Sequence, residues 1–217
     1  MMRYAVNFFR YHVVYQRYAA YTMISRLGFV DNLCLASDIL TSPTLKGGSV
    51  VECGTWRGGM SAGLVSAGGP DRGYYFFDSF AGLPPAQNID GEAALTWQAE
   101  TKDNCSASYQ EFVRLITTLG VPPFRLNIYK GYFEQTLPDF DPKPVALLRL
   151  DGDWYDSTMI CLEKFWPYVL SGGVVIIDDY YAWDGCSRAV HDFLSKRQLA
   201  EPIRNSRLNG VAYIRKR

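Results

Sequence analysis

Three aspartates that follow two apolar runs are the residues most able to do chemistry in this sequence. Asp151 follows the run 148–150, and Asp178 and Asp179 follow the run 174–177. Apolar runs without alternation are typical of parallel strands covered on both faces, and such strands end at the edge where α/β sheets bind ligands. Crowded carboxylates raise one another's pKa unless a divalent cation neutralises them. The trio therefore predicts an oxygen-rich metal site, although aspartates at strand ends also serve as turn formers or helix N-caps.

A glycine-rich loop after the first predicted strand offers a second site. Dinucleotide-binding loops follow G-x-G-x-x-G, but Trp56 stands where the second glycine would be, which argues against NAD or FAD. The G-K-[ST] signature of a phosphate loop is also missing there. The remaining pattern contains Glu52, Gly54 and Gly58, and Asp78 closes the next strand, where a carboxylate can accept both hydrogen bonds of a ribose diol. This combination resembles the S-adenosylmethionine site of class I methyltransferases.

Alternating strand and helix patterns must position these residues. Strands are predicted over 49–53, 74–77, 124–129, 145–150 and 174–177, with short closing strands near Ile203 and over 211–214. Helices are predicted over 60–67, 106–119, 155–167 and 185–196. Ser106 is the expected N-cap of the second helix and Pro167 is expected to end the third, which a turn at 171–173 connects to the next strand. Such repeats require a mostly parallel sheet with right-handed crossovers. We therefore predict an α/β fold with a doubly wound, mostly parallel seven-stranded sheet over residues 46–217, preceded by an aromatic helical extension over 1–45.

Five motifs follow one another along the chain: ECGTWRGG (52–59), DSFAGLP (78–84), GYFEQTLP (131–138), LDGDWY (150–155) and IDDY (177–180). In these motifs and in their order, the chain resembles the macrocin O-methyltransferase family from about Tyr21 to Leu194. The resemblance implies a Rossmann-like class I enzyme that uses S-adenosylmethionine and Mg²⁺ to methylate hydroxyl groups, commonly on sugars of glycosylated natural products.

The resemblance also implies roles for individual residues. Asp151, Asp178 and Asp179 would hold the metal ion, and Asp153 would act as general base on the acceptor, a vicinal diol being suited to the remaining metal positions. His191 is a competing base because histidine titrates near neutral pH. The residues expected to bind the cofactor are Glu52, Gly54, Thr55, Trp56, Gly58, Asp78, Ser79, Tyr132, Phe133 and Asp151.

Two other functions suit parts of the same pattern. A catechol would chelate the metal through adjacent hydroxyls, so a phenolic O-methyltransferase is an alternative. A cofactor-binding module without turnover is a second alternative, which the intact acidic residues argue against. Tyr132 and Phe133 would stack on the adenine or belong to the core. Arg149 lies inside an apolar strand, where a guanidinium needs an acidic partner, so we predict a structural ion pair.

Two segments outside the motifs invite interpretation. The stretch 79–104 is irregular and too long for an idle connection, which indicates a lid over the site or, alternatively, disorder without function. Near the start, Tyr4, Phe8, Tyr11, Tyr15 and Tyr18 recur at helical spacing with Arg3, Arg10 and Arg17 between them. Such a stripe suits packing on its own domain, a dimer contact that would make a homo-oligomer, or contact with a membrane surface.

Composition narrows the class of protein. Lys plus Arg and Asp plus Glu number 22 each, so no long-range attraction to nucleic acid is expected. The five cysteines are scattered, which is typical of buried thiols in a reducing cytoplasm. No run approaches the roughly 18 apolar residues of a spanning helix, and no signal-peptide pattern opens the chain. We expect a soluble cytoplasmic protein of 217 residues.

Overall fold

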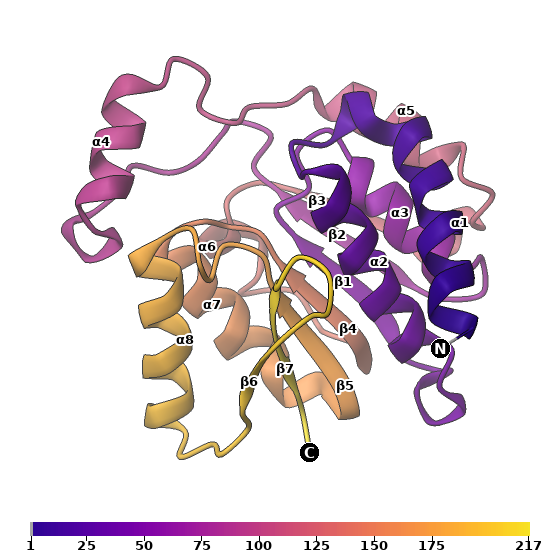
Figure 1. Cartoon of the computed structure of the whole chain (residues 1–217). Coiled ribbons are helices and arrows are strands. Elements are labelled where there is room, and N and C mark those ends of the chain that lie inside the picture. The colour runs from indigo at the N-terminus through magenta and orange to yellow at the C-terminus, as the bar shows by residue number, and fades with distance from the viewer. Residues whose placement is uncertain (1) are drawn as a thin grey trace.

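The computed structural model describes residues 2–217, with side chains from residue 6 onward, and shows a seven-stranded sheet between helices (Figure 1). The strand order is β3-β2-β1-β4-β5-β7-β6. Strands β1 to β5 are parallel, and β7 is antiparallel to both of its neighbours. The strands are β1 (Ser49–Cys53), β2 (Tyr74–Asp78), β3 (Leu126–Lys130), β4 (Val145–Leu150), β5 (Val169–Ile177), β6 (Ile203–Asn205) and β7 (Ala212–Arg215). The predicted α/β fold is confirmed.

Helices cover both faces of the sheet. Val174 and Ile176 of β5 pack into one layer and Val175 and Ile177 into the other, all four fully buried, as expected for parallel strands. The first layer holds α1 (Met2–Tyr18), α2 (Arg26–Leu40), α3 (Gly59–Gly68) and α5 (Tyr109–Thr117). The second holds α6 (Phe133–Thr136), α7 (Tyr155–Phe165) and α8 (Asp184–Lys196), whereas α4 (Glu92–Glu100) stands away from the sheet (Figure 1).

Two predicted boundaries are wrong for local reasons. The turn predicted at 171–173 is instead an irregular part of β5. Gly172 adopts φ +82° there, and the pairing of β5 with β4 shifts register near the start of both strands, so the strand continues through the irregularity. The predicted helix over 106–119 is shorter and begins at Tyr109. Ser108 is its N-cap, with Oγ accepting a hydrogen bond from the third backbone N–H of the helix at 3.2 Å.

The N-terminal aromatic stripe packs on its own domain. Tyr11 and Tyr18 are buried, and Phe8 and Tyr15 are partly buried against the core of the first helix layer. The side chain of Tyr4 lies outside the described residues. The first of the three alternatives therefore holds for the described part of the stripe, while the division of the chain at residue 45 stays a prediction. No helix within residues 2–217 has the length and apolarity needed to span a membrane.

The stretch 79–104 is not continuously irregular, which corrects the prediction. It contains α4, whose sequence EAALTWQAE is rich in helix formers, and a 3₁₀ turn at Asn88–Asp90. Asp90 is buried and its Oδ1 accepts from the backbone N–H of Tyr155 at 2.7 Å. Trp154 Nε1 donates to the carbonyl of Pro84 at 2.9 Å. The stretch is thus fastened to the first turn of α7.

Candidate active site

A cavity of about 570 Å³ opens at the carboxyl ends of β1, β2, β4 and β5. This is the point where the strand order reverses between β1 and β4, and where open α/β sheets bind ligands. Every predicted site residue except Gly58 lines the cavity: Glu52, Gly54, Thr55, Trp56, Asp78, Ser79, Tyr132, Phe133, Asp151, Asp153, Asp178 and Asp179.

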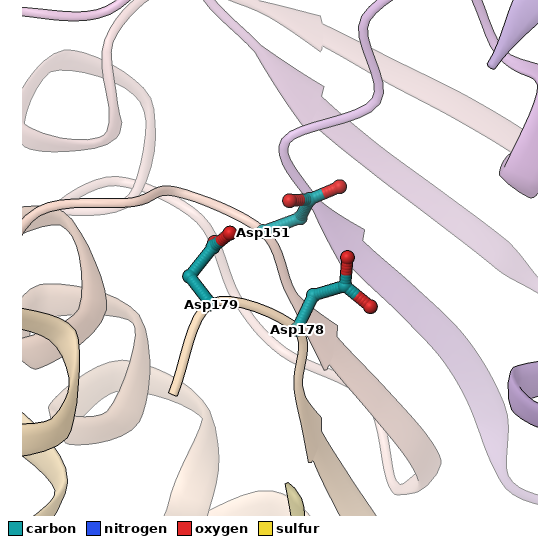
Figure 2. A group of neighbouring side chains, drawn as sticks. All are labelled: Asp151, Asp178 and Asp179. Carbon is teal, nitrogen blue, oxygen red and sulfur yellow. The ribbon is translucent and has the colours of Figure 1, made fainter. Parts of the chain in front are cut away.

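The structure brings the three predicted metal ligands together (Figure 2). One carboxylate oxygen from each of Asp151, Asp178 and Asp179 lies within 4.8 Å of the others. Burial, followed by the charges of neighbouring acids, raises the pKa of Asp179 well above its usual range. Burial also raises the pKa of Asp178, although Arg149 opposes the shift. The group therefore disfavours three simultaneous negative charges unless a cation is close.

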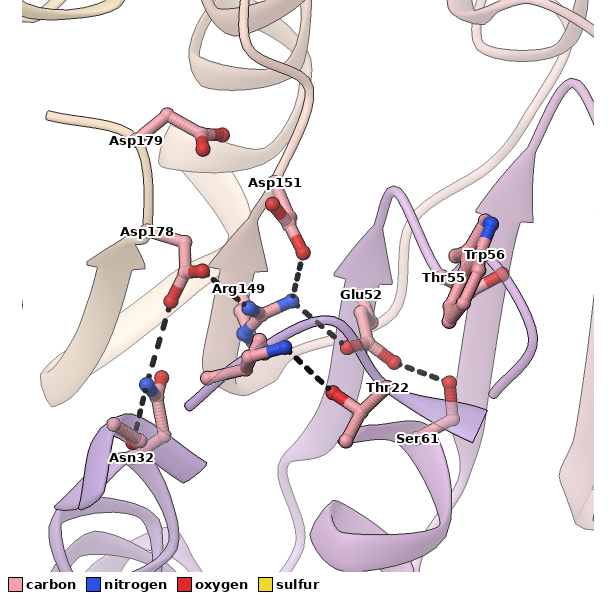
Figure 3. A network of polar contacts seen from close by, with 12 residues as sticks. Thr22, Asn32, Glu52, Thr55, Trp56, Ser61, Arg149, Asp151, Asp178 and Asp179 are labelled. Carbon is pink, nitrogen blue, oxygen red and sulfur yellow. Dashed lines mark hydrogen bonds and ion pairs between the residues drawn. The ribbon is translucent and has the colours of Figure 1, made fainter. Parts of the chain in front are cut away.

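A fully buried arginine lies beneath the trio (Figure 3). Arg149 Nη1 contacts Oε1 of Glu52 at 3.1 Å and Oδ2 of Asp151 at 2.8 Å, and its Nη2 contacts Oδ2 of Asp178 at 2.9 Å. The register of β1 and β4 pairs Glu52 with Arg149, so both side chains point to the same face of the sheet. The predicted structural ion pair is confirmed, and it extends to three acids.

The oxygens that remain fit a hard divalent cation. Arg149 contacts only Oδ2 of Asp151, and the backbone N–H of Asp153 donates only to Oδ2 of Asp179, at 3.1 Å. No residue in the described part of the chain donates to Oδ1 of Asp151 or Asp179. Carboxylate oxygens whose charge is incompletely offset are the ligands that Mg²⁺ prefers.

Asp153 lies beside the trio but is not one of its members. Its backbone has φ +58°, a left-handed conformation that few non-glycine residues adopt, although aspartate adopts it more readily than most. Burial and the charge of Asp151 raise the pKa of Asp153 to about 7. The competing base, His191, does not line the cavity and its Nε2 lies 2.9 Å from the hydroxyl of Tyr180.

Asp78 organises the glycine-rich loop. Its Oδ2 accepts from the backbone N–H groups of Thr55 at 2.7 Å and Trp56 at 2.8 Å, and its Oδ1 accepts from that of Phe80 at 2.6 Å. Trp56 adopts φ +47°, so this position needs the left-handed backbone usual for glycine although its residue is bulky. A carboxylate retains further lone pairs, so the expected contact with a ribose stays a prediction.

In the ECGTWRGG motif, positions 54 and 58 require glycine, and Glu52 is buried. Gly54 has φ +87°, and a Cβ there would lie 1.7 Å from the carbonyl oxygen of Asp151. Gly58 is the N-cap of α3 and has φ +90°. A Cβ there would lie 2.9 Å from the ring of Phe112, so Gly58 serves packing outside the cavity. Glu52 is fully buried between Arg149 and the hydroxyl of Ser61, and burial raises its pKa to about 7.

The remaining residues expected to bind the cofactor follow β2 and β3. Tyr132 is the N-cap of α6 and Phe133 its first residue, and both line the cavity. Phe133 also packs against the core of the second helix layer, which confirms the core alternative for it, and stacking on an adenine stays a prediction. Ser79 shapes the turn after β2 by donating to the carbonyl of Gly82 at 2.7 Å.

The cavity also includes residues that the sequence did not single out. Among them are Tyr21 to Ser25, Asn32, Cys105 and Asn209 to Val211. Asn32 is buried, and its Nδ2 donates to Oδ1 of Asp178 at 3.3 Å. Asp31 beside it accepts from the backbone N–H of Asn209 at 2.7 Å and so holds the loop between β6 and β7 at the cavity. The sequence signal for Asn32 and Asp31 was a polar pair among the apolar residues of α2.

Comparisons with known proteins agree with this geometry. The family model described as Macrocin-O-methyltransferase (TylF) matches residues 12–216. The chain is 33% identical, over 88% of its length and 74% of the relative's, to 8-demethyl-8-(2,3-dimethoxy-alpha-L-rhamnosyl)-tetracenomycin-C 4'-O-methyltransferase of Streptomyces olivaceus. It is 31% identical, over 77% and 68% respectively, to mycinamicin III 3''-O-methyltransferase of Micromonospora griseorubida. The solved structure of the O-methyltransferase NovP superposes with a TM-score of 0.74 at 27% identity, over 91% of this chain and 83% of that one.

Proposed function

Because the chain belongs to the macrocin-O-methyltransferase family and is an O-methyltransferase, we propose that it transfers the methyl group of S-adenosylmethionine to a sugar hydroxyl of a glycosylated natural product, with Mg²⁺ bound. The convergence of Asp151, Asp178 and Asp179 at the cavity, with Asp153 beside them, carries the metal-dependent part of the proposal. The sugar acceptor is supported by the names of the two similar enzymes, which act on a rhamnosyl tetracenomycin and on mycinamicin III.

The chemistry divides between the bound groups and the protein. The cofactor would supply a methyl group activated on a sulfonium, and Mg²⁺ would lower the pKa of the acceptor hydroxyl. Asp151, Asp178 and Asp179 would hold the ion through carboxylate oxygens, and Asp153 would accept the hydroxyl proton. General base catalysis contributes roughly 10² to 10⁴ in rate, so the larger share of the acceleration would come from alignment of the reacting atoms in the cavity.

Labelled S-adenosylmethionine tests the proposal directly. The protein is incubated with mycinamicin III, with 8-demethyl-8-(2,3-dimethoxy-α-L-rhamnosyl)-tetracenomycin C and with catechol, and the methylated product is identified by mass. We expect label in a glycoside, loss of transfer with EDTA and recovery with Mg²⁺. Methylation of catechol alone would favour the phenolic alternative, and full activity in EDTA would refute the metal.

Two carboxylate variants separate the metal from the base. Asp179→Asn is expected to weaken Mg²⁺ binding measured by calorimetry, because it removes a charged ligand from the trio. Asp153→Asn is expected to lower the rate by roughly 10² or more while Mg²⁺ still binds. Asp141→Asn, at an exposed carboxylate paired with Lys143 outside the cavity, is the matched control.

A further inference from the structure

Within the described residues, one oxygen of the Asp153 carboxylate accepts a hydrogen bond from a side chain, and the other does not. Its Oδ1 accepts a hydrogen bond from Nε1 of Trp183 at 2.8 Å. No residue among those that the structure describes donates to its Oδ2. The strained backbone of Asp153 is tied through its N–H to Asp179, so the indole of Trp183 is what sets the remaining torsions of the side chain.

Trp183 reaches Asp153 from behind the cavity. It precedes α8 and is not one of the residues that line the cavity. Its ring is held by two other indoles in edge-to-face contact, that of Trp154 with centroids 5.3 Å apart and that of Trp97 with centroids 5.8 Å apart. Trp97 and Trp154 also meet, at 6.2 Å. Edge-to-face pairs at these separations are favourable and fix ring orientation.

The third indole belongs to a different part of the chain. Trp97 lies on α4, within the stretch 79–104. Pro84, at the start of the same stretch, accepts a hydrogen bond from Nε1 of Trp154 at 2.9 Å. The packing of this stretch against α7 therefore brings Trp97 into contact with Trp183.

We infer that Trp183 is a positioning residue for Asp153 and that Trp97, carried by the stretch 79–104, holds Trp183 in the orientation that aims the free carboxylate oxygen into the cavity. The inference rests on the proposed role of Asp153 as base. Neither tryptophan touches the acceptor in this scheme. Their effect is on the geometry of proton transfer, where a small misplacement has a large effect on rate.

Single-turnover methylation tests the inference, with an acceptor that the labelling experiment identifies and with Asp153→Asn as reference. Trp183→Phe keeps an aromatic ring but removes the N–H donor. We expect its rate to fall about tenfold or more, with the affinities for Mg²⁺ and S-adenosylmethionine unchanged. Trp97→Ala is expected to give a smaller loss, and the double variant no more loss than Trp183→Phe, because the two residues act on one group. Trp166→Phe, at a buried indole outside the cavity, is the matched control.

The outcomes separate the role of Asp153 as base from the role of Trp183 in positioning it. An unaltered rate in Asp153→Asn would refute the proposed base and the inference together. An impaired Asp153→Asn beside a fully active, folded Trp183→Phe would overturn the inference alone. Crystal structures of the unmodified protein and of Trp183→Phe give a readout that needs no acceptor, since we expect the Asp153 carboxylate to rotate in the variant. A carboxylate that keeps its position without the indole N–H would overturn the inference.

Discussion

Arg149 Nη1 lies 2.8 Å from Oδ2 of Asp151, so a fully buried cation contacts one of the carboxylates that are proposed to bind the metal. The same guanidinium contacts Glu52 and Asp178. The protein thus carries a counter-ion of its own, which offsets part of the repulsion among the acids and holds their side chains in place without a metal.

Replacing this guanidinium should destabilise the fold. In Arg149→Met, Glu52 and two aspartates lose their buried partner, and removal of one member of a buried ion pair costs about 3–5 kcal/mol. Arg149→Lys should lose less, because an ammonium keeps the charge but lacks the planar fork. Urea unfolding at pH 7 in EDTA measures the loss of unfolding free energy in both variants. Mg²⁺ should stabilise Arg149→Met more than the unmodified protein, and a methionine variant as stable as the unmodified protein would contradict the prediction.

The buried Glu52 should make the metal-free protein less stable as pH rises. Burial raises its pKa from an ordinary 4.5 to about 7, so the folded state keeps a proton that the unfolded chain releases. The contribution of Glu52 to stability should be greatest below pH 4.5 and should fall between pH 4.5 and about 7, by at most about 1.4 kcal/mol per pH unit. Denaturation in EDTA across this range should show a shallower slope for Glu52→Gln. The exposed Glu111→Gln is the control, and identical slopes in all three proteins would refute the assignment.

Gly54 should be irreplaceable where Gly47 is not. An alanine at position 54 would need a left-handed backbone, which costs roughly 1–3 kcal/mol, and would collide with the carbonyl of Asp151. Gly54→Ala is therefore expected to lower the unfolding midpoint and to abolish measurable S-adenosylmethionine binding in calorimetry. A Cβ at Gly47 meets open space, so Gly47→Ala should bind normally. Normal cofactor affinity in Gly54→Ala would show that the loop tolerates displacement.

Asp90 should hold the stretch 79–104 on α7. Its Oδ1 accepts from the first backbone N–H of that helix at 2.7 Å, where the adjoining N-cap residue Trp154 provides no side-chain bond. Loss of such a cap costs about 0.5–2 kcal/mol, so Asp90→Ala should lower stability by that amount and expose the stretch to limited proteolysis. Asp90→Asn retains an acceptor oxygen and should be cut more slowly. Equal cleavage of the alanine variant and the unmodified protein would show that other contacts suffice.

The strand segments and the position of the acids followed from local pattern. Uninterrupted apolar runs predicted the parallel strands, and aspartates at their ends had to emerge at one edge, because parallel strands share a direction. The helix in 79–104 was missed because nearby glycines and prolines outweighed a short run of helix formers. The N-cap at Ser108 was placed too early because neighbouring serines are equivalent in sequence and only the backbone geometry selects one.

The sequence by itself determined the alternation of strands and helices, the acidic edge and the glycine turn, because these depend on periodicity and on backbone freedom within a few residues. Only the tertiary structure decided that Arg149 contacts Glu52, Asp151 and Asp178 together, and that Trp183 donates a hydrogen bond to Asp153. Those contacts join residues that are distant along the chain, and their geometry depends on strand register and on the packing of loops from separate crossovers. No local pattern encodes that information.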